Sequence, residues 1–255
     1  MLLARLRARC GLQPGHKRIL RGDDLVHLWQ DFLTNNQRPI HKWPHYFPAY
    51  ERHFSRFRDL SITFIEIGCG RGGSLQMWKR YFGPFAQIVG LDIADKCTKY
   101  EEDQIAVRIG DQSDPGFLQR VADEFGPIDI VLDDGSHINK HMVTSFRTLY
   151  PHVQKNGVYM VEDMHTCYWP DYGGGYKHPE SFMELCKDLL DELNGRGRAA
   201  PTTDFNRTTV SMHFYSSVAV FEKGRHLEKK SLMTPTKRRT TIAAGPTSGS
   251  GAFTA

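Results

Sequence analysis

The sequence predicts an α/β fold, with a doubly wound seven-stranded sheet that ends in an antiparallel hairpin. Apolar runs of strand length alternate with helical periodicity along most of the chain. The run that ends at Ile67 breaks into glycines and then becomes helical, as in a strand, a tight turn and a helix start. Only Ser216 and Ser217 separate the last two apolar runs, which requires these strands to be antiparallel.

The predicted elements follow one another in a regular order. The strands cover residues 63–67, 87–92, 105–109, 128–133, 157–162, 210–215 and 218–222. The helices between them cover residues 74–82, 115–125, 139–150 and 180–193, and residues 196–206 are expected to be a loop.

A small N-terminal helical flap is expected before the sheet. Residues 24–33 have the pattern of an amphipathic helix, and prolines on both sides of Tyr46 predict an ordered loop. Tyr50 and Phe54 then recur at helical spacing, so we expect them to pack on the sheet.

The chain has 255 residues, enough for one α/β domain with small additions. We expect an N-terminal helical and loop segment over 1–58 that covers the site. The main domain then spans 59–223, and a basic and then disordered tail follows over 224–255.

Charge is distributed unevenly. Residues 1–21 carry six basic residues and no acid, residues 223–239 carry seven basic and one acidic, and residues 22–222 carry a net charge of −8. This disfavours nucleic-acid binding by the main domain, although either basic segment could contact an anionic partner. The Arg-rich start also resembles a mitochondrial presequence, but five cysteines without a C-x-x-C pair favour a reducing cytoplasm. No apolar run approaches the length of a membrane span.

The glycine-rich turn offers a ligand site. Gly68, Gly70 and Gly72 permit positive φ and let a ligand approach bare backbone. Gly68, Gly70 and Gly73 also have the G-x-G-x-x-G spacing of a dinucleotide site. Glu66 argues against that ligand, because its carboxylate would repel a pyrophosphate, and favours one with a cationic end. S-adenosylmethionine (SAM), which carries an ammonium and no phosphate, is therefore the predicted cofactor.

Three further residues are assigned to this cofactor. Asp92 ends the strand 87–92, where a carboxylate can accept from both ribose hydroxyls. Asp111 and Gln112 follow the strand 105–109 at the same edge of the sheet, so we expect them to meet the adenine.

Acidic residues follow two neighbouring strands. Asp133 and Asp134 end one strand, Glu162 and Asp163 end the next, and the carboxyl ends of such strands converge. Crowded carboxylates need a cation, and oxygen ligands without cysteine favour Mg²⁺, with Mn²⁺ and Ca²⁺ left open. Asp133 is assigned to SAM and the other three to the metal. The alternative is that these acids only cap the following helices.

The remaining candidates are a base and a set of aromatic residues. His137, three residues after Asp134, is the candidate general base, while His141 and His165 are given supporting roles. The candidates for contact with the substrate are Trp43, His45 and Tyr46 in the N-terminal segment, and Tyr168, Trp169 and Tyr172, which are expected to form a lid ahead of a Gly-Gly-Gly hinge.

With these motifs, the chain resembles the magnesium- and SAM-dependent sugar O-methyltransferases of the macrocin and mycinamicin type. The resemblance covers about residues 40–223, and it implies that Asp134, Glu162 and Asp163 bind metal and that His137 is the base. The matching pieces are Glu66-x-Gly68-x-Gly70-x-Gly72, Gly110-Asp-Gln-Ser-Asp114, Leu132-Asp-Asp-Gly-Ser-His137, Glu162-Asp163, Tyr168-Trp-Pro-Asp-Tyr-Gly-Gly-Gly175 and His213-Phe-Tyr215. The family's N-terminal signature begins with Asp-Lys, where this chain has His41-Lys42.

The sequence therefore predicts a cytoplasmic, homo-oligomeric enzyme that transfers a methyl group from SAM to a hydroxyl of a sugar. A catechol-type acceptor also offers two neighbouring oxygens to magnesium and stays open as the acceptor. An NAD-dependent oxidoreductase and a non-catalytic protein with the same fold are the two competing hypotheses for the function.

Overall fold

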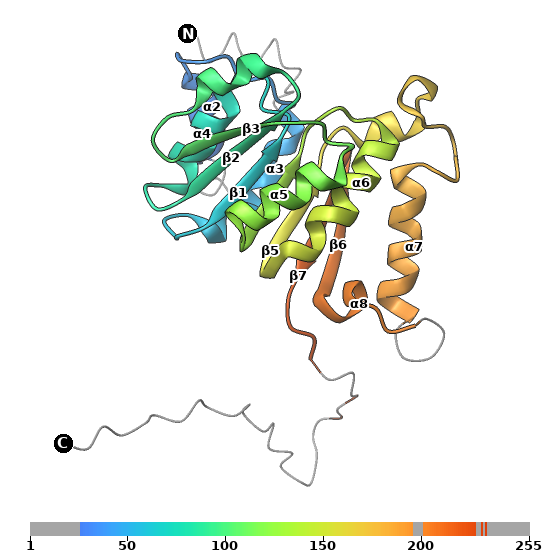
Figure 1. Cartoon of the computed structure of the whole chain (residues 1–255). Helices are drawn as coiled ribbons and strands as arrows, with labels where there is room; N and C mark the ends of the chain where they lie inside the picture. The colour runs from blue at the N-terminus through green and yellow to red at the C-terminus, as the bar shows by residue number, and fades with distance from the viewer. Residues whose placement is uncertain (1–25, 196–200, 228–230, 232, 234–255) are drawn as a thin grey trace, which may run out of the picture.

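The computed structural model describes residues 26–195, 201–227, 231 and 233. One seven-stranded sheet has the order β3-β2-β1-β4-β5-β7-β6 (Figure 1). Its strands are β1 (Thr63–Ile67), β2 (Gln87–Asp92), β3 (Ile105–Ile109), β4 (Ile128–Asp133), β5 (Val153–Val161), β6 (Thr209–Tyr215) and β7 (Val218–Lys223). Strand β7 pairs antiparallel with β5 and β6, whereas the other pairs are parallel. The predicted fold is confirmed.

The chain reverses its direction of travel across the sheet beside β1. Strands β2 and β3 lie on one side of β1, and β4 and β5 lie on the other. In open α/β sheets, ligands bind beyond the carboxyl ends of the strands at such a switch point. The residues that follow β1 to β5 therefore meet at one edge of the sheet, as the sequence predicted.

Helices cover both faces of this sheet (Figure 1). The α-helices are α2 (Val26–Thr34), α3 (Phe47–Phe54), α4 (Gly73–Phe82), α5 (Pro115–Phe125), α6 (Asn139–Leu149), α7 (Phe182–Gly195) and α8 (Asp204–Thr208). Short 3-10 helices are η1 (Pro44–Tyr46), η2 (Ser55–Phe57), η3 (Asp95–Tyr100), η4 (Tyr150–His152), η5 (Met164–Tyr168) and η6 (Pro170–Tyr172).

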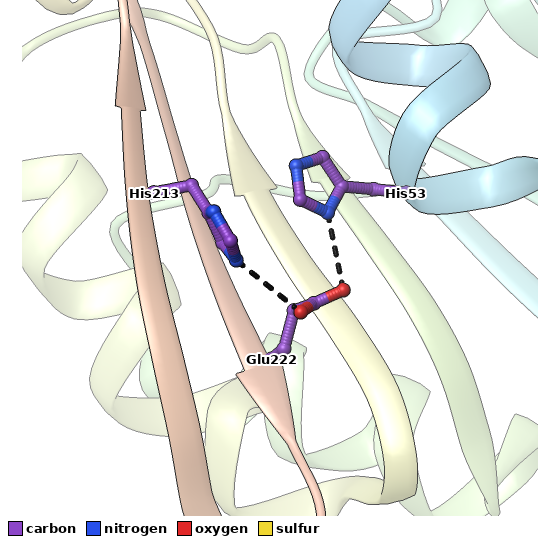
Figure 2. Close-up of side chains that lie close together, drawn as sticks. All are labelled: His53, His213 and Glu222. Atoms are coloured by element: carbon purple, nitrogen blue, oxygen red, sulfur yellow. Dashed lines mark hydrogen bonds and ion pairs between the residues drawn. The ribbon is translucent and has the colours of Figure 1, made fainter.

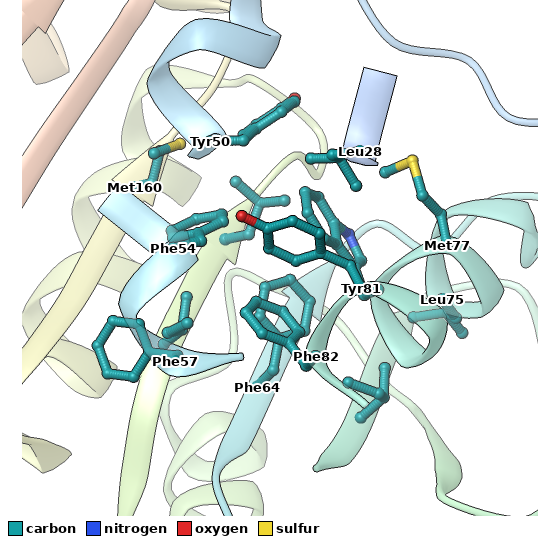
Figure 3. Packing of buried hydrophobic residues seen from close by; sticks show 14 of the residues in the cluster. Leu28, Tyr50, Phe54, Phe57, Phe64, Leu75, Met77, Tyr81, Phe82 and Met160 are labelled. Carbon is teal, nitrogen blue, oxygen red and sulfur yellow. The ribbon is translucent and has the colours of Figure 1, made fainter. Parts of the chain in front are cut away.

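Each face has its own apolar cluster. On one face, Phe54 of α3 and Phe82 of α4 pack on Phe64 of β1, with ring centroids 6.1 and 5.2 Å from that of Phe64 (Figure 3). On the other face, Phe146 of α6 packs on Phe221 of β7. Helix α3 of the N-terminal segment is thus part of the core, and the predicted packing of Tyr50 and Phe54 is confirmed.

Three local predictions are wrong. The loop expected around Tyr46 is the 3-10 helix η1 followed by α3, because Pro48 stands in the first turn of α3, where a missing N–H costs little. Strand β5 begins at Val153 rather than at residue 157. The expected loop 196–206 contains the start of α8, which Thr203 caps by accepting from Asn206 N.

Several predictions fall outside the described residues. They concern the basic start 1–21, the first two residues of the helix 24–33, residues 196–200 and the tail 243–255. The proposed domain boundaries stay predictions. Within the described ranges, no helix is both long enough and apolar enough to cross a membrane.

Candidate active site

A cavity of about 230 Å³ lies at the carboxyl ends of β1, β2 and β3. Asp92, Asp111 and Gln112, all predicted to contact the cofactor, line it together with His141. The Asp92 carboxylate is held in one orientation, because its two oxygens accept from Gly70 N and Ala94 N, each at 2.9 Å. A fixed carboxylate at this edge fits the ribose hydroxyls of a nucleoside such as that of SAM.

The three glycines of the β1–α4 loop serve different purposes. All have positive φ, at 86° for Gly68, 51° for Gly70 and 72° for Gly72. A Cβ on Gly68 would lie 2.1 Å from Asp134 O, and one on Gly72 would lie 2.5 Å from the Tyr100 ring. Close packing of the protein itself therefore requires these two. Only at Gly70 would a Cβ meet nothing within 4 Å, so Gly70 is the one whose bare backbone faces open space.

Helix α4 begins directly beneath the N-terminal segment. A Cβ on Gly73 would lie 2.3 Å from Pro39 O and 2.5 Å from Arg38 O. The absence of a side chain at Gly73 lets residues 38–39 cross the helix start. The chain that follows carries His41, Lys42 and Trp43 to the edge of the sheet.

A second cavity, of about 610 Å³, adjoins the first at Gly68, which lines both. Its wall includes Asp134, His137 and Asp163, whose possible ligand atoms all lie within 4.8 Å of one another. All three side chains are partly exposed to the cavity. The two carboxylates in this arrangement fit a divalent cation, with the His137 imidazole beside them.

Lys42 provides a positive charge beside these acidic residues. The sequence analysis did not predict this role. Its Nζ lies 2.6 Å from Asp134 Oδ2, 3.0 Å from Glu162 Oε1 and 3.1 Å from Glu66 Oε1, and its side chain is 1 % exposed. Burial alone would lower the pKa of Lys42, but the carboxylates of Asp134 and Glu162 raise it above its ordinary value. The lysine therefore stays charged and joins the ends of β1, β4 and β5.

Two tyrosines of the N-terminal segment hold the other predicted metal ligands. Tyr50 OH donates to Glu162 Oε1 at 2.5 Å, and Tyr46 OH donates to Asp163 Oδ1 at 2.5 Å. Both tyrosines are buried, so Tyr46 supports Asp163 from below and exposes almost no surface to a substrate. Glu162 is also buried, whereas Asp134 and Asp163 reach the cavity. The role of Glu162 as a metal ligand therefore stays a prediction.

Glu66 is fully buried beneath the glycine loop. Ser74 Oγ donates to its Oε2 at 2.6 Å, and Trp78 Nε1 donates to its Oε1 at 3.3 Å. Burial raises the pKa of Glu66. The ammonium that contacts Glu66 is that of Lys42, in the role predicted for the ammonium of the cofactor, so direct contact between Glu66 and SAM stays a prediction.

Asp133 and Gln112 bond to each other under the first cavity. Gln112 Nε2 donates to Asp133 Oδ1 at 2.7 Å, while Gln112 Oε1 accepts from Ser136 N at 3.0 Å. Ser145 Oγ donates to Asp133 Oδ2 at 2.5 Å, and burial raises the pKa of Asp133 to about 6. Asp133 lines neither cavity, and its contact with the cofactor also stays a prediction.

His137 faces the acidic residues through Nε2, which lies 3.3 Å from Asp163 Oδ2 and 3.8 Å from Asp134 Oδ1. Its Nδ1 is buried without a hydrogen-bond partner among the described residues. His137 and Asp163 both have positive φ, which is uncommon for residues other than glycine and often marks functional sites. Thr166 Oγ1 donates to the carbonyls of both residues and so fixes them relative to each other.

Exposed aromatic rings continue outward from Asp163. The His165 ring lies 4.8 Å from Trp169 and 6.3 Å from Trp43, and both tryptophans are about half exposed. His45 contacts Trp43, and Tyr172 contacts Trp169. Tyr168 is exposed, and a Cβ on Gly174 would lie 2.4 Å from Cys167 O, so close packing fixes this turn. The rings of Trp43, His165 and Trp169 thus form a row of edge-to-face contacts beside the acidic cavity.

Comparison with known proteins gives a consistent set of relatives. No model of a protein family matches the chain. The chain is 45% identical over 192 residues to the 8-demethyl-8-alpha-L-rhamnosyl tetracenomycin-C 2'-O-methyltransferase of Streptomyces olivaceus, covering 70% of this chain and 50% of that one. It is 41% identical over 237 residues to the mycinamicin VI 2''-O-methyltransferase of Micromonospora griseorubida, covering 85% of this chain and 58% of that one. The chain thus spans about half the length of the curated relatives it matches.

A solved structure agrees with these relatives. The MycE methyltransferase from the mycinamycin biosynthetic pathway, in complex with Mg, SAH and mycinamycin VI, superposes with a TM-score of 0.71 at 40% identity. The match covers 86% of this chain and 58% of that one. The fold is therefore that of the class I SAM-dependent methyltransferases. Within that class, the chain belongs to the sugar O-methyltransferases of the macrocin and mycinamicin type, and the predicted resemblance is confirmed.

Proposed function

We propose that this chain transfers a methyl group from SAM to a hydroxyl of a sugar in a glycoside, with a divalent cation bound between Asp134 and Asp163. The observation that carries the proposal is the junction of the two cavities at Gly68. A ligand whose adenosine end lies beside Asp92 therefore extends past the glycine loop toward the acidic residues. The names of the relatives, all sugar O-methyltransferases, support the acceptor class.

The residues divide the work between binding and proton transfer. Asp134 and Asp163 would hold magnesium, with Glu162 as a further predicted ligand, and Asp92 would hold the ribose of SAM. Magnesium supplies Lewis-acid activation of the acceptor hydroxyl, and SAM supplies the methyl group. His137 takes the hydroxyl proton at Nε2, the ring nitrogen that faces the acidic residues.

The aromatic row positions the acceptor. Trp43 and Trp169 are each about half exposed, so a pyranose can pack its apolar face on these rings and exclude water from the acidic cavity. A homo-oligomer and a cytoplasmic location stay predictions from the sequence.

The proposal is tested with labelled SAM and a panel of acceptors. The panel contains mycinamicin VI, demethylmacrocin, a rhamnosyl tetracenomycin and a simple catechol, each assayed in EDTA and after addition of magnesium. We expect the sugar of a glycoside to gain the mass of one CH₂, and only after magnesium has been added. Transfer to the catechol alone would support a catechol-type acceptor, and full turnover in verified metal-free protein would reject the metal site.

A binding measurement separates this enzyme from an oxidoreductase and from a non-catalytic protein. Isothermal titration calorimetry with SAM and with NAD should show binding of SAM only. Binding of NAD in place of SAM would reject the cofactor assignment. Tight SAM binding without transfer to any acceptor would favour a non-catalytic protein.

A further inference from the structure

A second group of metal-ligating side chains lies away from the acidic cavity. His53 of α3, His213 of β6 and Glu222 of β7 point toward one another across the junction between the N-terminal segment and the hairpin (Figure 2). Glu222 pairs with Val158 of β5, whereas the acidic residues of the active site follow the end of that strand at Val161. The possible ligand atoms of the three residues lie within 4.8 Å of one another.

We propose that His53, His213 and Glu222 form a zinc site that fastens α3 to the β6–β7 hairpin. His53 Nδ1 lies 3.1 Å from Glu222 Oε1, and His213 Nε2 lies 3.3 Å from Glu222 Oε2. A tetrahedral zinc ion with bonds of about 2.0–2.1 Å holds its ligand atoms roughly 3.3 Å apart. Both nitrogen-to-oxygen distances are therefore close to the spacing that the ion requires. Two imidazoles and one carboxylate favour zinc over magnesium, which prefers oxygen ligands.

Neighbouring groups orient these side chains as outer-shell partners do in metal sites. The Tyr215 hydroxyl lies 2.9 Å from His53 Nε2, so it can accept the one ring proton and leave Nδ1 free to bind. Ser211 Oγ donates to Glu222 Oε2 at 2.9 Å and so orients the carboxylate, while its contact of 3.1 Å with His213 Nε2 would be replaced by the ion.

One cation already contacts the carboxylate. Arg56 NH1 donates to Glu222 Oε1 at 2.8 Å, and Arg56 NH2 donates to Asn156 O at 3.2 Å. The Arg56 side chain is 43 % exposed, so it can turn toward solvent while the ion takes its place at Glu222. Water then completes the coordination on the exposed side, where His213 and Glu222 are only partly buried.

The test is a cobalt titration of the 255-residue chain. Asp134→Asn and Asp163→Asn are introduced together, so that the acidic cavity no longer competes for the metal. We expect one equivalent of Co²⁺ to give the intense visible absorption of a four-coordinate centre, and one equivalent of Zn²⁺ to abolish it. If no such absorption develops and calorimetry detects no zinc binding, the proposal is wrong.

Variants then assign the ligands. His213→Ala in the same background should weaken zinc binding by more than about 100-fold, because loss of an outer-shell partner alone costs roughly 10–100-fold. Tyr215→Phe, which removes an outer-shell partner, should weaken zinc binding by only about 10–100-fold. His178→Ala, which removes a histidine outside the cluster, should bind zinc like its parent. Equal zinc affinity in His213→Ala and His178→Ala would overturn the assignment.

Stability provides an independent measurement, which applies even if one variant folds poorly. Zinc should raise the midpoint of thermal unfolding in the parent and in His178→Ala, because the ion binds the folded protein and joins two separate elements. Glu222→Gln should lose this rise. An equal rise in Glu222→Gln would show that zinc binds elsewhere and would reject the proposal.

Discussion

Replacement of Lys42 by methionine tests whether one buried ammonium holds the candidate active site together. The change removes the charge and keeps a flexible side chain of similar length. It leaves the carboxylates of Glu66 and Glu162, which are 0 % and 2 % exposed, without their shared cation. Removal of one partner of a buried ion pair typically costs about 3–5 kcal/mol, because the remaining charge stays buried and uncompensated. We expect a loss of that size in the free energy of unfolding.

The matched control is Lys79→Met, which removes a lysine from the surface. Lys79 Nζ lies 3.3 Å from Glu102 Oε1, and both side chains are about a quarter exposed. Surface ion pairs of this kind contribute less than about 1 kcal/mol. Urea unfolding of both variants in EDTA, followed by tryptophan fluorescence at pH 7, gives the two free energies of unfolding. A loss in Lys42→Met as small as that in Lys79→Met would refute the reasoning.

The pH dependence of Lys42→Met gives a second check. Burial raises the pKa of Glu66 and Glu162, and loss of Lys42 removes the nearby charge that opposes this rise. The folded variant therefore binds protons at a higher pH than the unfolded chain does. Its deficit relative to the wild type should shrink as the pH falls below 7, because protonation removes the uncompensated charges. A deficit that grows in acid would contradict the proposed cause.

Three further predictions concern the cofactor, the base and the strand β4. Asp92→Ala should weaken SAM binding by about 1–3 kcal/mol in calorimetry, since it removes the predicted ribose acceptor and the bond to Gly70 N. His137→Ala should lower kcat by about 10²–10⁴-fold and leave SAM affinity unchanged. A larger loss of kcat in His141→Ala would contradict the assignment of His137 as the base. Burial raises the pKa of Asp129, so the folded form favours its protonated state and stability falls as the pH rises through that pKa. Asp129→Asn should therefore be more stable than the wild type at pH 7 and show little difference at pH 3 in urea unfolding.

Sequence pattern predicts the sheet well, because apolar runs bounded by glycine and acidic residues define its strands. Strands β1 to β4 have the predicted bounds, and adjacency of β4 and β5 brings Asp134 and Asp163 together. The two sides of a strand were harder to assign. Asp133 and Asp134 are consecutive, so their side chains point in opposite directions, one toward Ser145 and the other toward Lys42. The alternation of side chains along a strand would have predicted that only one of these two acids faces the cavity.

The role of Lys42 could not be derived from local pattern. It precedes β1 by 21 residues, and its partners lie at the ends of three different strands. Lysine is seldom fully buried unless it is paired, and this one lies next to aromatic residues that were assigned to the substrate site, shortly before the core residues Tyr50 and Phe54. That combination is the signal that could have identified Lys42 as the partner of the acidic residues.

The crossing of residues 38–39 over Gly73 has a consequence for protein engineering. Consider a chimera that takes its first 58 residues from one relative and its sheet from another. Residues 38–39 and the start of α4 then come from different proteins, although a methyl group added at Gly73 would collide with the Arg38 and Pro39 carbonyls. Helix α4 and the segment that carries Lys42, Tyr46 and Tyr50 should therefore be taken from the same protein. We expect exchanges of acceptor preference to succeed when the boundary lies after Phe82, and to yield inactive protein when it lies at residue 58.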